Sequence, residues 1–482
     1  FSSLGANLVI VLPGRSGTGG INPANAITTT VPYLVAPGTQ SFTCQMRYDI
    51  EVDYDYAYVD DGGTRFDPTD DVERKRQNAD FLEGFGFANL AVETSEHSHV
   101  DLVFMGLGRE GGEPGPGSSP ALQARLKNTR LIGSASWLQQ KGGRHPYRLQ
   151  IAANYDYGLR RFTDELNEIG IGGPQRTNDQ THAMVGRVAG SVSAVSWLEV
   201  TAIGSVRYQA FDPENELSVV QQPRSHRLTA AGTIETRFFG TLGPVRLELR
   251  PSIRLGWTRA AINQSSLAGP QNPDSSDFFP TYRVATAIAP LEWLAFRGSV
   301  SSGYKLPSIL QLFGNGSTVV PNPRLVPERS LSYDGGITVR GRSGIVSGYA
   351  SFGAFGAQID DMIRFSRTSQ FTLIAQNIDS GRTRGVELEL RGGLTQHFVL
   401  QGEASWTQAV DQATGNQLPG QPEWVAFAQP EAHSGTLSKQ VSDIMAFFQV
   451  SYIGRSYADP TNLIVIRART VLATGIGVDM FE

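Results

Sequence analysis

The chain contains a single cysteine, Cys44, so no disulfide can form within it. It also lacks any run approaching the roughly 20 consecutive apolar residues that a membrane-spanning helix requires. Charged residues make up only 18% of the chain and the net charge is −5, so no basic surface indicates nucleic acid as a partner. Helical periodicity is almost absent as well. These shortages argue against a disulfide scaffold, a helical membrane protein and a nucleic-acid-binding protein.

Residue patterns typical of enzymes are also missing. The seven histidines are scattered, without an HExxH motif or a Cys/His metal spacing. The loop serines lack the context of a nucleophile elbow. The glycine-rich segment 111–117 contains prolines, which remove amide donors, and no Gly-Lys-Ser/Thr follows it. We therefore expect no catalytic residues, no resident cofactor and no enzymatic activity.

Alternating polar and apolar residues recur along the chain, which is the period-two pattern of β-strands. The clearest case runs from Arg246 to Trp257, and similar alternation occurs in 148–157, 384–391 and 400–407. In the clearest case the polar set is Arg246, Glu248, Arg250, Ser252 and Arg254, and the apolar set is Leu247, Leu249, Ile253, Leu255 and Trp257. The pattern predicts an all-β fold.

Short turns and long polar loops follow one another strictly along the chain. The short turns are expected at 94–98, 140–145, 194–197, 240–244, 289–292, 341–344, 393–396 and 440–442. The long loops are expected at 60–78, 108–126, 158–179, 210–225, 261–280, 303–330, 408–423 and 454–462. A compact loop at 366–370 stands where a long one is due. An up-and-down transmembrane barrel has this order of loops, whereas a Greek-key sandwich has no reason to adopt it.

The segments predict a large antiparallel barrel with about 18 strands of roughly 9 to 15 residues each. Barrels of about 22 strands belong to the plugged-transporter class, so we expect a few strands to be missing and the chain to be truncated at both ends. Residues 1–47 match no strand pattern and are expected to be an irregular or disordered lead-in, while 48–482 form the barrel.

The cost of exposing charge to lipid decides which face of each strand points outward. Lipid offers no partner to an ionised group, so the Arg/Glu faces are expected to line a water-filled lumen. Aromatic residues close to the short turns are expected to form an interfacial girdle. These residues are Trp137, Trp197, Phe239, Trp293 and Phe398. A soluble sandwich that buries the same aromatics in its core is the alternative.

The segment from Gly303 to Ser330 carries a recognisable motif. Its matching residues are Tyr304, Lys305, Pro307, Leu312, Phe313, Gly314, Asn322, Pro323, Leu325, Pro327, Glu328 and Ser330. This segment resembles the strand, long loop and strand of TonB-dependent outer-membrane receptors. Asn377, Gly385 and Glu387 are similar to a later motif of that family, and 60–81, 106–116 and 418–422 resemble other parts of it. In the motif we expect the prolines to keep the chain extended and Glu328 to pair with an Arg or with Lys305.

The resemblance implies the barrel portion of a receptor in the bacterial outer membrane, without its plug domain. Such a receptor imports a bulky, scarce nutrient chelate, for example a ferric siderophore or cobalamin. The implied partners are outer-membrane lipid and lipopolysaccharide, the nutrient chelate, and the TonB complex, which would act through a plug absent from this chain. A monomer is expected. A passive porin-like channel and a soluble carbohydrate-binding β-protein remain as alternatives.

Candidate ligand contacts come from arginines and aromatics in or next to the long loops. They are Arg160, Arg161, Phe278, Phe279, Tyr282 and Tyr457. An acidic stretch that includes Asp60 and Asp61 could bind Ca²⁺, because hard cations take several oxygen ligands on a flexible loop. This stretch does not fit the EF-hand pattern, and a solvated loop is the simpler interpretation. Loop calcium in some cobalamin transporters of the family keeps the calcium hypothesis open.

Overall fold

The computed structural model describes the backbone and side chains of ten ranges, and the backbone alone of four further strands. The ten ranges are 77–115, 120–169, 173–219, 224–262, 275–314, 319–367, 373–378, 380–395, 397–438 and 441–480. Within them, residues 366, 367, 378 and 480 are described by their backbone alone. The backbone strands are 29–32, 39–51, 56–59 and 72–75. Asp60 and Asp61, the calcium candidates, lie outside the described residues.

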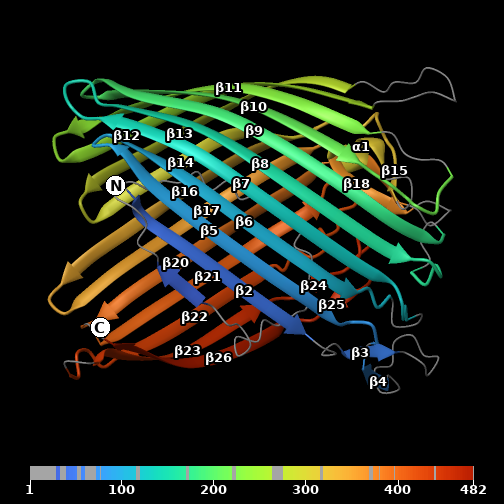
Figure 1. Cartoon of the computed structure of the whole chain (residues 1–482). Helices are drawn as coiled ribbons and strands as arrows, with labels where there is room; N and C mark the ends of the chain where they lie inside the picture. The colour runs from blue at the N-terminus through green and yellow to red at the C-terminus, as the bar shows by residue number, and fades with distance from the viewer. Residues whose placement is uncertain are drawn as a thin grey trace.

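A single antiparallel sheet of 19 strands dominates the described chain and curls into a barrel (Figure 1). Consecutive strands of this sheet are neighbours, so the topology is up-and-down. The strands are β1 (Thr29–Pro32), β2 (Thr39–Glu51), β5 (Phe81–Ser95), β6 (Ser98–Gly112), β7 (Arg125–Lys141), β8 (Tyr147–Asp164), β9 (Gln175–Val195), β10 (Leu198–Asp212), β11 (Ser225–Leu242), β12 (Val245–Ile262), β13 (Ser275–Leu291), β14 (Leu294–Lys305), β16 (Glu328–Ser343), β17 (Val346–Asp360), β20 (Gly381–Leu394), β21 (Phe398–Asp411), β22 (Trp424–His433), β23 (Val441–Ile453) and β26 (Arg469–Met480). The predicted all-β, up-and-down barrel of about 18 strands is confirmed.

Seven short strands and one helix lie in the long connections, outside the main sheet. They are β3 (Tyr56–Val59), β4 (Val72–Lys75), α1 (Ile309–Phe313), β15 (Val319–Val320), β18 (Met362–Arg367), β19 (Leu373–Ile378), β24 (Ser456–Tyr457) and β25 (Val465–Ile466). No helix in the described residues has the length and apolarity needed to cross a membrane. The two ends of the barrel therefore differ. Short turns connect neighbouring strands at one end, and α1 and the long loops lie at the other (Figure 1).

Two expectations about strand positions are wrong. The compact loop expected at 366–370 does not join two barrel strands. Instead the connection from β17 to β20 contains the hairpin β18–β19, which pairs with β15 apart from the main sheet. Residues 1–47 are also not free of strands, because β1 pairs with β2 and β2 begins at Thr39. Pairing with neighbouring strands creates these elements, although their sequences lack clear alternation.

Several strands exceed the predicted 9 to 15 residues, and β9 reaches 21. The hydrogen-bonded ladder continues beyond the span that crosses a bilayer, which needs about 9 to 11 residues. At the long-loop end, for example, Glu216 N–H donates to the Arg176 carbonyl and Asn178 N–H donates to the Glu214 carbonyl. The long-loop hairpins therefore project as extensions of the barrel wall.

The two faces of the sheet differ in the way that alternation predicts. Gln209, Arg227 and Ala260 are register partners across three strands and so share one face. Residues two apart in β12 share that face as well, which places the set Arg246 to Arg254 beside Ala260. Helix α1 packs against Ala260, so this face is the interior of the barrel. On the opposite face, Ile253 is 52% exposed.

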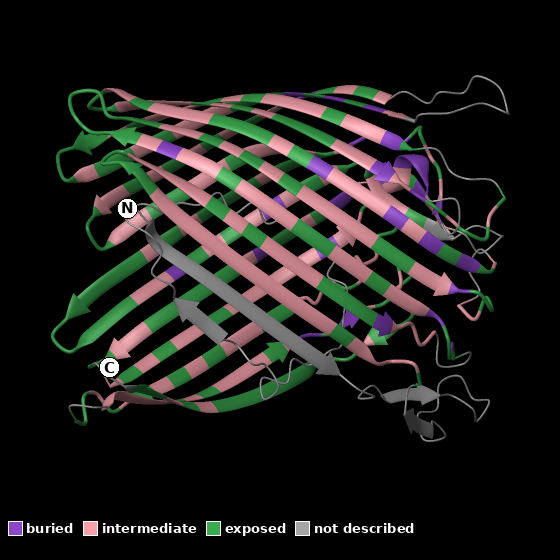
Figure 2. Cartoon of the chain, in the orientation of Figure 1, coloured by how far each residue is buried: buried purple, intermediate pink, exposed green. Residues whose placement is uncertain are grey.

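The outer face is apolar over most strands, and only 14 hydrophobic side chains are buried in the described part of the chain. Exposed and half-buried residues alternate along the strands with few buried ones (Figure 2). Monomeric soluble proteins rarely expose apolar patches larger than a few hundred Å². The outer face is therefore suited to hydrocarbon, and the arrangement contradicts the soluble sandwich, in which a second sheet would cover these side chains.

An aromatic girdle lies on the outer face near the short turns, with two corrections. Trp197 stacks on Phe238, with ring centroids 6.1 Å apart, and both are exposed. Phe239, which was predicted for the girdle, instead lies on the inner face, where the Arg237 guanidinium covers its ring at 4.6 Å. Phe398 is exposed near its turn, as predicted. Trp293 is also exposed, but it lines a cavity together with Arg340 and Tyr349 of the inner face. Trp137 is the register partner of the outward-facing Ile151.

Candidate functional site

The connection from β14 to β16 folds into the barrel at its long-loop end. Helix α1 starts there because Ser308 caps it: the Ser308 hydroxyl accepts from the Gln311 N–H, and the Gln311 side chain accepts from the Ser308 N–H. This reciprocal capping box satisfies two donors that a helix of one turn otherwise leaves free. Gly314, with φ of 69°, ends the helix in a conformation that favours glycine. Pro307 precedes the cap.

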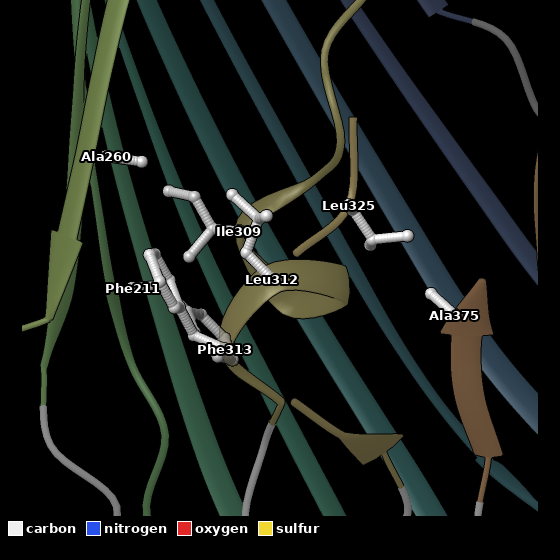
Figure 3. Close-up of a cluster of buried hydrophobic side chains, with 7 residues drawn as sticks. All are labelled: Phe211, Ala260, Ile309, Leu312, Phe313, Leu325 and Ala375. Atoms are coloured by element: carbon white, nitrogen blue, oxygen red, sulfur yellow. The ribbon is translucent and has the colours of Figure 1, made fainter. Parts of the chain in front are cut away.

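A buried hydrophobic cluster fixes this connection to the barrel wall. Leu312 and Phe313 of α1 and Leu325 of the loop are at most 5% exposed. They meet side chains of β10, β12 and β19 (Figure 3). The full cluster is Phe211, Ala260, Ile309, Leu312, Phe313, Leu325 and Ala375. Burial of several large apolar side chains, each worth about 1.5–3 kcal/mol, holds the loop inside the barrel.

Two asparagines bridge this loop and the β18–β19 hairpin. Asn322 Nδ2 donates to the Ala375 carbonyl at 2.8 Å. Asn377 accepts from the Val326 N–H at 2.9 Å and donates to the Val326 and Asp361 carbonyls at 2.9 and 2.7 Å. An amide side chain has both donors and an acceptor, so one Asn can replace the missing backbone pairing of two loops. These bonds give Asn322 and Asn377 of the motif a structural role.

Charged groups attach the same loop to three further elements. Glu328 is buried, accepts from Lys305 Nζ at 2.8 Å and also from the Ile363 N–H at 3.0 Å. The expected pairing of Glu328 with Lys305 is therefore present. Arg227 of β11 donates to the Pro307 carbonyl and to Gln209. Pro327 is buried at the return to β16, whereas Pro323 is exposed.

Tyr304 and Phe279 form an aromatic pair on the inner face below this loop. Their rings stack with centroids 4.6 Å apart, and Phe279 is 6% exposed. Phe279 lies over Gly256, where an added Cβ would be 2.0 Å from its ring. Nearby, Gly303 leaves room for the Ser330 hydroxyl, which an added Cβ would approach to 2.3 Å. Glycine on one strand thus makes space for a side chain on the next.

Replacing Gly256 by alanine is expected to lower the free energy of unfolding by about 1–2 kcal/mol, because Phe279 cannot turn aside while it stacks on Tyr304. Gly232 on the adjacent strand has no atom within 4 Å of an added Cβ. Gly232→Ala should therefore change stability by less than about 0.5 kcal/mol. Urea unfolding in detergent micelles measures both values. Equal losses in the two variants would contradict the packing described for Phe279.

Gly385 and Glu387 of the second motif lie on the inner face of β20. An added Cβ at Gly385 would be 2.6 Å from the Phe355 ring, so this glycine accommodates an aromatic side chain in the same way as Gly256. Glu387 and Glu389 follow on the same face, with Glu403 as the register partner of Glu389. These carboxylates give the β20–β21 wall a negative inner face.

Arginines dominate the opposite part of the inner face. Arg237 pairs with Glu199 and Glu248, with N–O distances of 3.4 and 2.9 Å. Four more arginines share this face and form no ion pair with a described carboxylate. They are Arg187, Arg207, Arg254 and Arg283. The lumen therefore carries excess positive charge from β9 to β13 and negative charge on β20 and β21.

The predicted ligand contacts do not form one cluster. Arg160 and Asp179 are register partners on the inner face, and Arg161 donates to Asn178 on the outer side. Phe279 faces inward but is buried. Phe278 and Tyr282 lie on the outer face at 63% and 53% exposure. The side chains of Phe278 and Tyr282 point outward, because each lies one residue away from a position that faces the lumen. This placement argues against contacts between these two residues and a ligand in the lumen.

Tyr457, the remaining candidate, belongs to the β24–β25 hairpin of the long-loop end. Its carbonyl accepts from the Gly420 N–H, which joins this hairpin to the β21–β22 loop. The hairpin turn is organised by Asp459. The Asp459 carboxylate accepts from the N–H groups of Ile464 at 2.6 Å, Thr461 at 3.0 Å and Leu463 at 3.2 Å.

The pH dependence of this turn follows from its hydrogen bonds. The Thr461 hydroxyl and then the backbone N–H groups hold the pKa of Asp459 down to about 2. Because the pKa of Asp459 is lowered, its carboxylate contributes fully to the stability of the turn above the ordinary pKa near 3.8. This contribution is lost as the pH falls towards 2. We expect the Ile464 amide proton, followed by NMR in detergent, to titrate near pH 2. A midpoint near 3.8 would contradict the hydrogen bonds of the turn.

Sequence patterns gave no sign of two other contacts. Arg227 occupies an alternating position like the other inner-face arginines. Nothing in its sequence context indicates that it, and not another arginine, donates to the Pro307 carbonyl. Glu168 lies in a long loop and accepts from the Gln123 and Ala124 N–H groups at 2.7 and 3.1 Å. The bonds from Gln123 and its neighbours lower the pKa of Glu168. Glu168 thus joins the loops after β6 and β8.

An apolar outer face, a charged lumen and a loop packed into one mouth define a large transmembrane β-barrel. Residues 47–478 match the family model described as TonB dependent receptor-like, beta-barrel. The chain belongs to this family, which confirms the family resemblance inferred from the sequence.

Individual relatives agree with this membership. A segment of 141 residues is 29% identical to the vitamin B12 transporter BtuB of Vibrio vulnificus. The matched segment covers 29% of this chain and 21% of that protein. The fold is similar to the copper transporter OprC, with a TM-score of 0.68 at 14% identity over 94% of this chain and 69% of that one. It is also similar to the FrpB iron transporter of Neisseria meningitidis, with a TM-score of 0.69 at 12% identity over 93% of this chain and 70% of that one.

Proposed function

We propose that the chain forms the barrel of an outer-membrane receptor that imports a metal-containing nutrient chelate by TonB-dependent transport. The observation that carries this proposal is the mouth itself. The loop with α1, Asn322 and Asn377 is fixed inside a polar lumen, so passage is restricted by an ordered element.

The names of the similar proteins support a metal-containing cargo. They include a vitamin B12 transporter, a copper transporter, an iron transporter and the ferric yersiniabactin uptake receptor of Yersinia pestis. The cargoes differ, but each contains a metal. A ferric siderophore and cobalamin are the two cargoes that we propose to test first. Energy for release would come from TonB through a plug domain, and the barrel would contact lipid and lipopolysaccharide as a monomer.

Uptake measured in the source bacterium tests this proposal. Cells that carry the gene, a deletion strain and a complemented strain are supplied with ⁵⁵Fe-labelled siderophores or ⁵⁷Co-labelled cobalamin under starvation. We expect one of these cargoes to accumulate only when the gene is present, and accumulation to stop when tonB is deleted or a protonophore is added. Accumulation that survives both treatments would identify a passive channel instead. Equal uptake of every cargo without the gene would contradict the proposal.

A further inference from the structure

Three arginines of β9, β10 and β11 form a diagonal row on the inner wall, beneath the loop that carries α1. Arg187 is the register partner of Ser205, which lies two residues before Arg207 on β10. Arg207 is the register partner of Thr229, which lies two residues after Arg227 on β11. Diagonal neighbours on adjacent strands are about 7–8 Å apart at their roots, within reach of long side chains. Arg187, Arg207 and Arg227 are therefore neighbours, and we refer to them as the arginine row.

Arg227 fixes the upper end of the row, at the long-loop end of β11. Its guanidinium donates to the Pro307 carbonyl and to Gln209 Oε1, the latter at 2.7 Å. Both acceptors are uncharged, so these bonds orient Arg227 without neutralising it. Burial, and next the positive charge of Arg207, lower the pKa of Arg227 to about 10. The two cations are thus close enough for the charge of one to act on the other.

The other two arginines of the row have no charged partner in the described part of the chain. Arg187 and Arg207 are both exposed to the lumen and form no ion pair with a described carboxylate. On the adjacent strand β8, Asp156 also faces the lumen, but it is already paired with Arg130 at 2.7 Å. The row therefore keeps its positive charge.

The inner-face carboxylates of β9, β10 and β11 are too distant to change this. They are Asp179, Glu199 and Glu235, and each lies about 26 Å along its strand from the arginine of that strand. The side chains between the arginines are small or neutral. The register partners of Arg187 are Ala152 and Ser205, and those of Arg207 are Val185 and Thr229. These residues leave the exposed guanidinium groups accessible from the lumen.

The arrangement suits one class of ligand. Arginine binds carboxylate and phosphate groups through two parallel N–H···O bonds. Three positive charges spread over roughly 15 Å of wall suit an anion with more than one such group. We propose that the arginine row binds a ligand with several carboxylate or phosphate groups, directly beneath the loop that carries α1. The inference rests on the proposed function and adds to it that the cargo carries negatively charged oxygen groups.

Calorimetric titration of the full chain in detergent micelles tests this site. The probes are pyrophosphate and citrate, with acetate and glucose as references of lower or no charge. We expect pyrophosphate or citrate to bind with a dissociation constant below about 1 mM. Binding should weaken as salt is added, because the charges lie in a water-filled lumen. Acetate should bind more weakly than either probe, and glucose should give no heat.

Substitutions in the row separate this site from the general charge of the lumen. Arg207→Gln should weaken binding by at least about tenfold, and Arg187→Gln/Arg207→Gln should abolish it. Arg207→Lys keeps the charge and should lose less than Arg207→Gln. Arg148→Gln is the control with the same change in charge, because Arg148 is an exposed inner-face arginine of β8 outside the row. Circular dichroism verifies that each variant is folded.

Three results would overturn the inference. They are no heat from either probe, equal heats for pyrophosphate, citrate and acetate, and a loss of binding in Arg148→Gln as large as in Arg207→Gln. Binding is measured on the isolated chain, so its outcome is independent of the uptake experiment. A protein that takes up a chelate but binds neither probe would refute this site alone. A protein that binds the probes but takes up no chelate would refute the proposed function alone.

Discussion

Replacing Leu388 by arginine should lower the free energy of unfolding by about 2–4 kcal/mol, because it places a charge in hydrocarbon near the bilayer midplane. Leu388 is at the centre of β20, on the outer face, and 39% of its surface is exposed. Its register partners, Phe352 and Ala404, carry no charge that could pair with the arginine. Urea unfolding of protein reconstituted in lipid vesicles measures the loss.

The matched control introduces the same residue on the other face of the neighbouring strand. Ser405 is at the centre of β21 and is the register partner of Glu387. Arginine at 405 would lie beside Glu387 and Glu403 in the water-filled lumen, so Ser405→Arg should cost less than about 1 kcal/mol. If both arginines destabilise the protein equally, or if Leu388→Arg is the milder change, the assignment of faces is wrong.

Removing the Asn377 side chain should release the loop that constricts the mouth. Asn377→Ala loses three hydrogen bonds to Val326 and Asp361 at once. At about 1 kcal/mol for each bond, the local opening free energy should fall by roughly 3 kcal/mol. Hydrogen exchange of residues 319–328 and 373–378 should then accelerate about a hundredfold, while exchange in β7 and β8 stays unchanged.

Asn178→Ala is the control for this variant. Asn178 also has bonds at the long-loop end, donating to Glu214 and accepting from Arg161, but it is not in contact with α1 or β19. Its removal should leave exchange around Leu325 within about twofold of the parent protein. Equal protection of the 319–328 segment in Asn377→Ala and the parent would show that the hydrophobic cluster alone holds the loop.

The sequence was sufficient for the features that depend on alternation. Arg246 to Trp257 predicted which side chains face the lumen, because a half-buried strand repeats every two residues. The order of short turns and long loops predicted an up-and-down barrel. Where two aromatics are adjacent, as at Phe238 and Phe239, alternation cannot tell them apart. The wrong one was therefore assigned to the girdle, and the same ambiguity affected Phe278 and Phe279.

The mouth could be predicted only in part. The motif residues indicated a strand, a loop and a strand, and the pairing of Lys305 with Glu328. Helix α1 has five residues, too few for a helical period to show. The β18–β19 hairpin was hidden because its turn was interpreted as a barrel connection. Arg227 contacts Pro307, which is 80 residues away in the chain, through tertiary packing that no local pattern records.

Spin labels placed one at a time at positions 247 to 255 of β12, in protein reconstituted in lipid bilayers, test the central claim most directly. Oxygen, which partitions into hydrocarbon, should relax the labels at Leu247, Leu249, Ile253 and Leu255 most strongly. A water-soluble nickel complex should relax those at Glu248, Arg250, Ser252 and Arg254, which gives two profiles of period two in opposite phase. Profiles that coincide, or labels at the leucine positions shielded from both reagents, would contradict a barrel with hydrocarbon outside and water within.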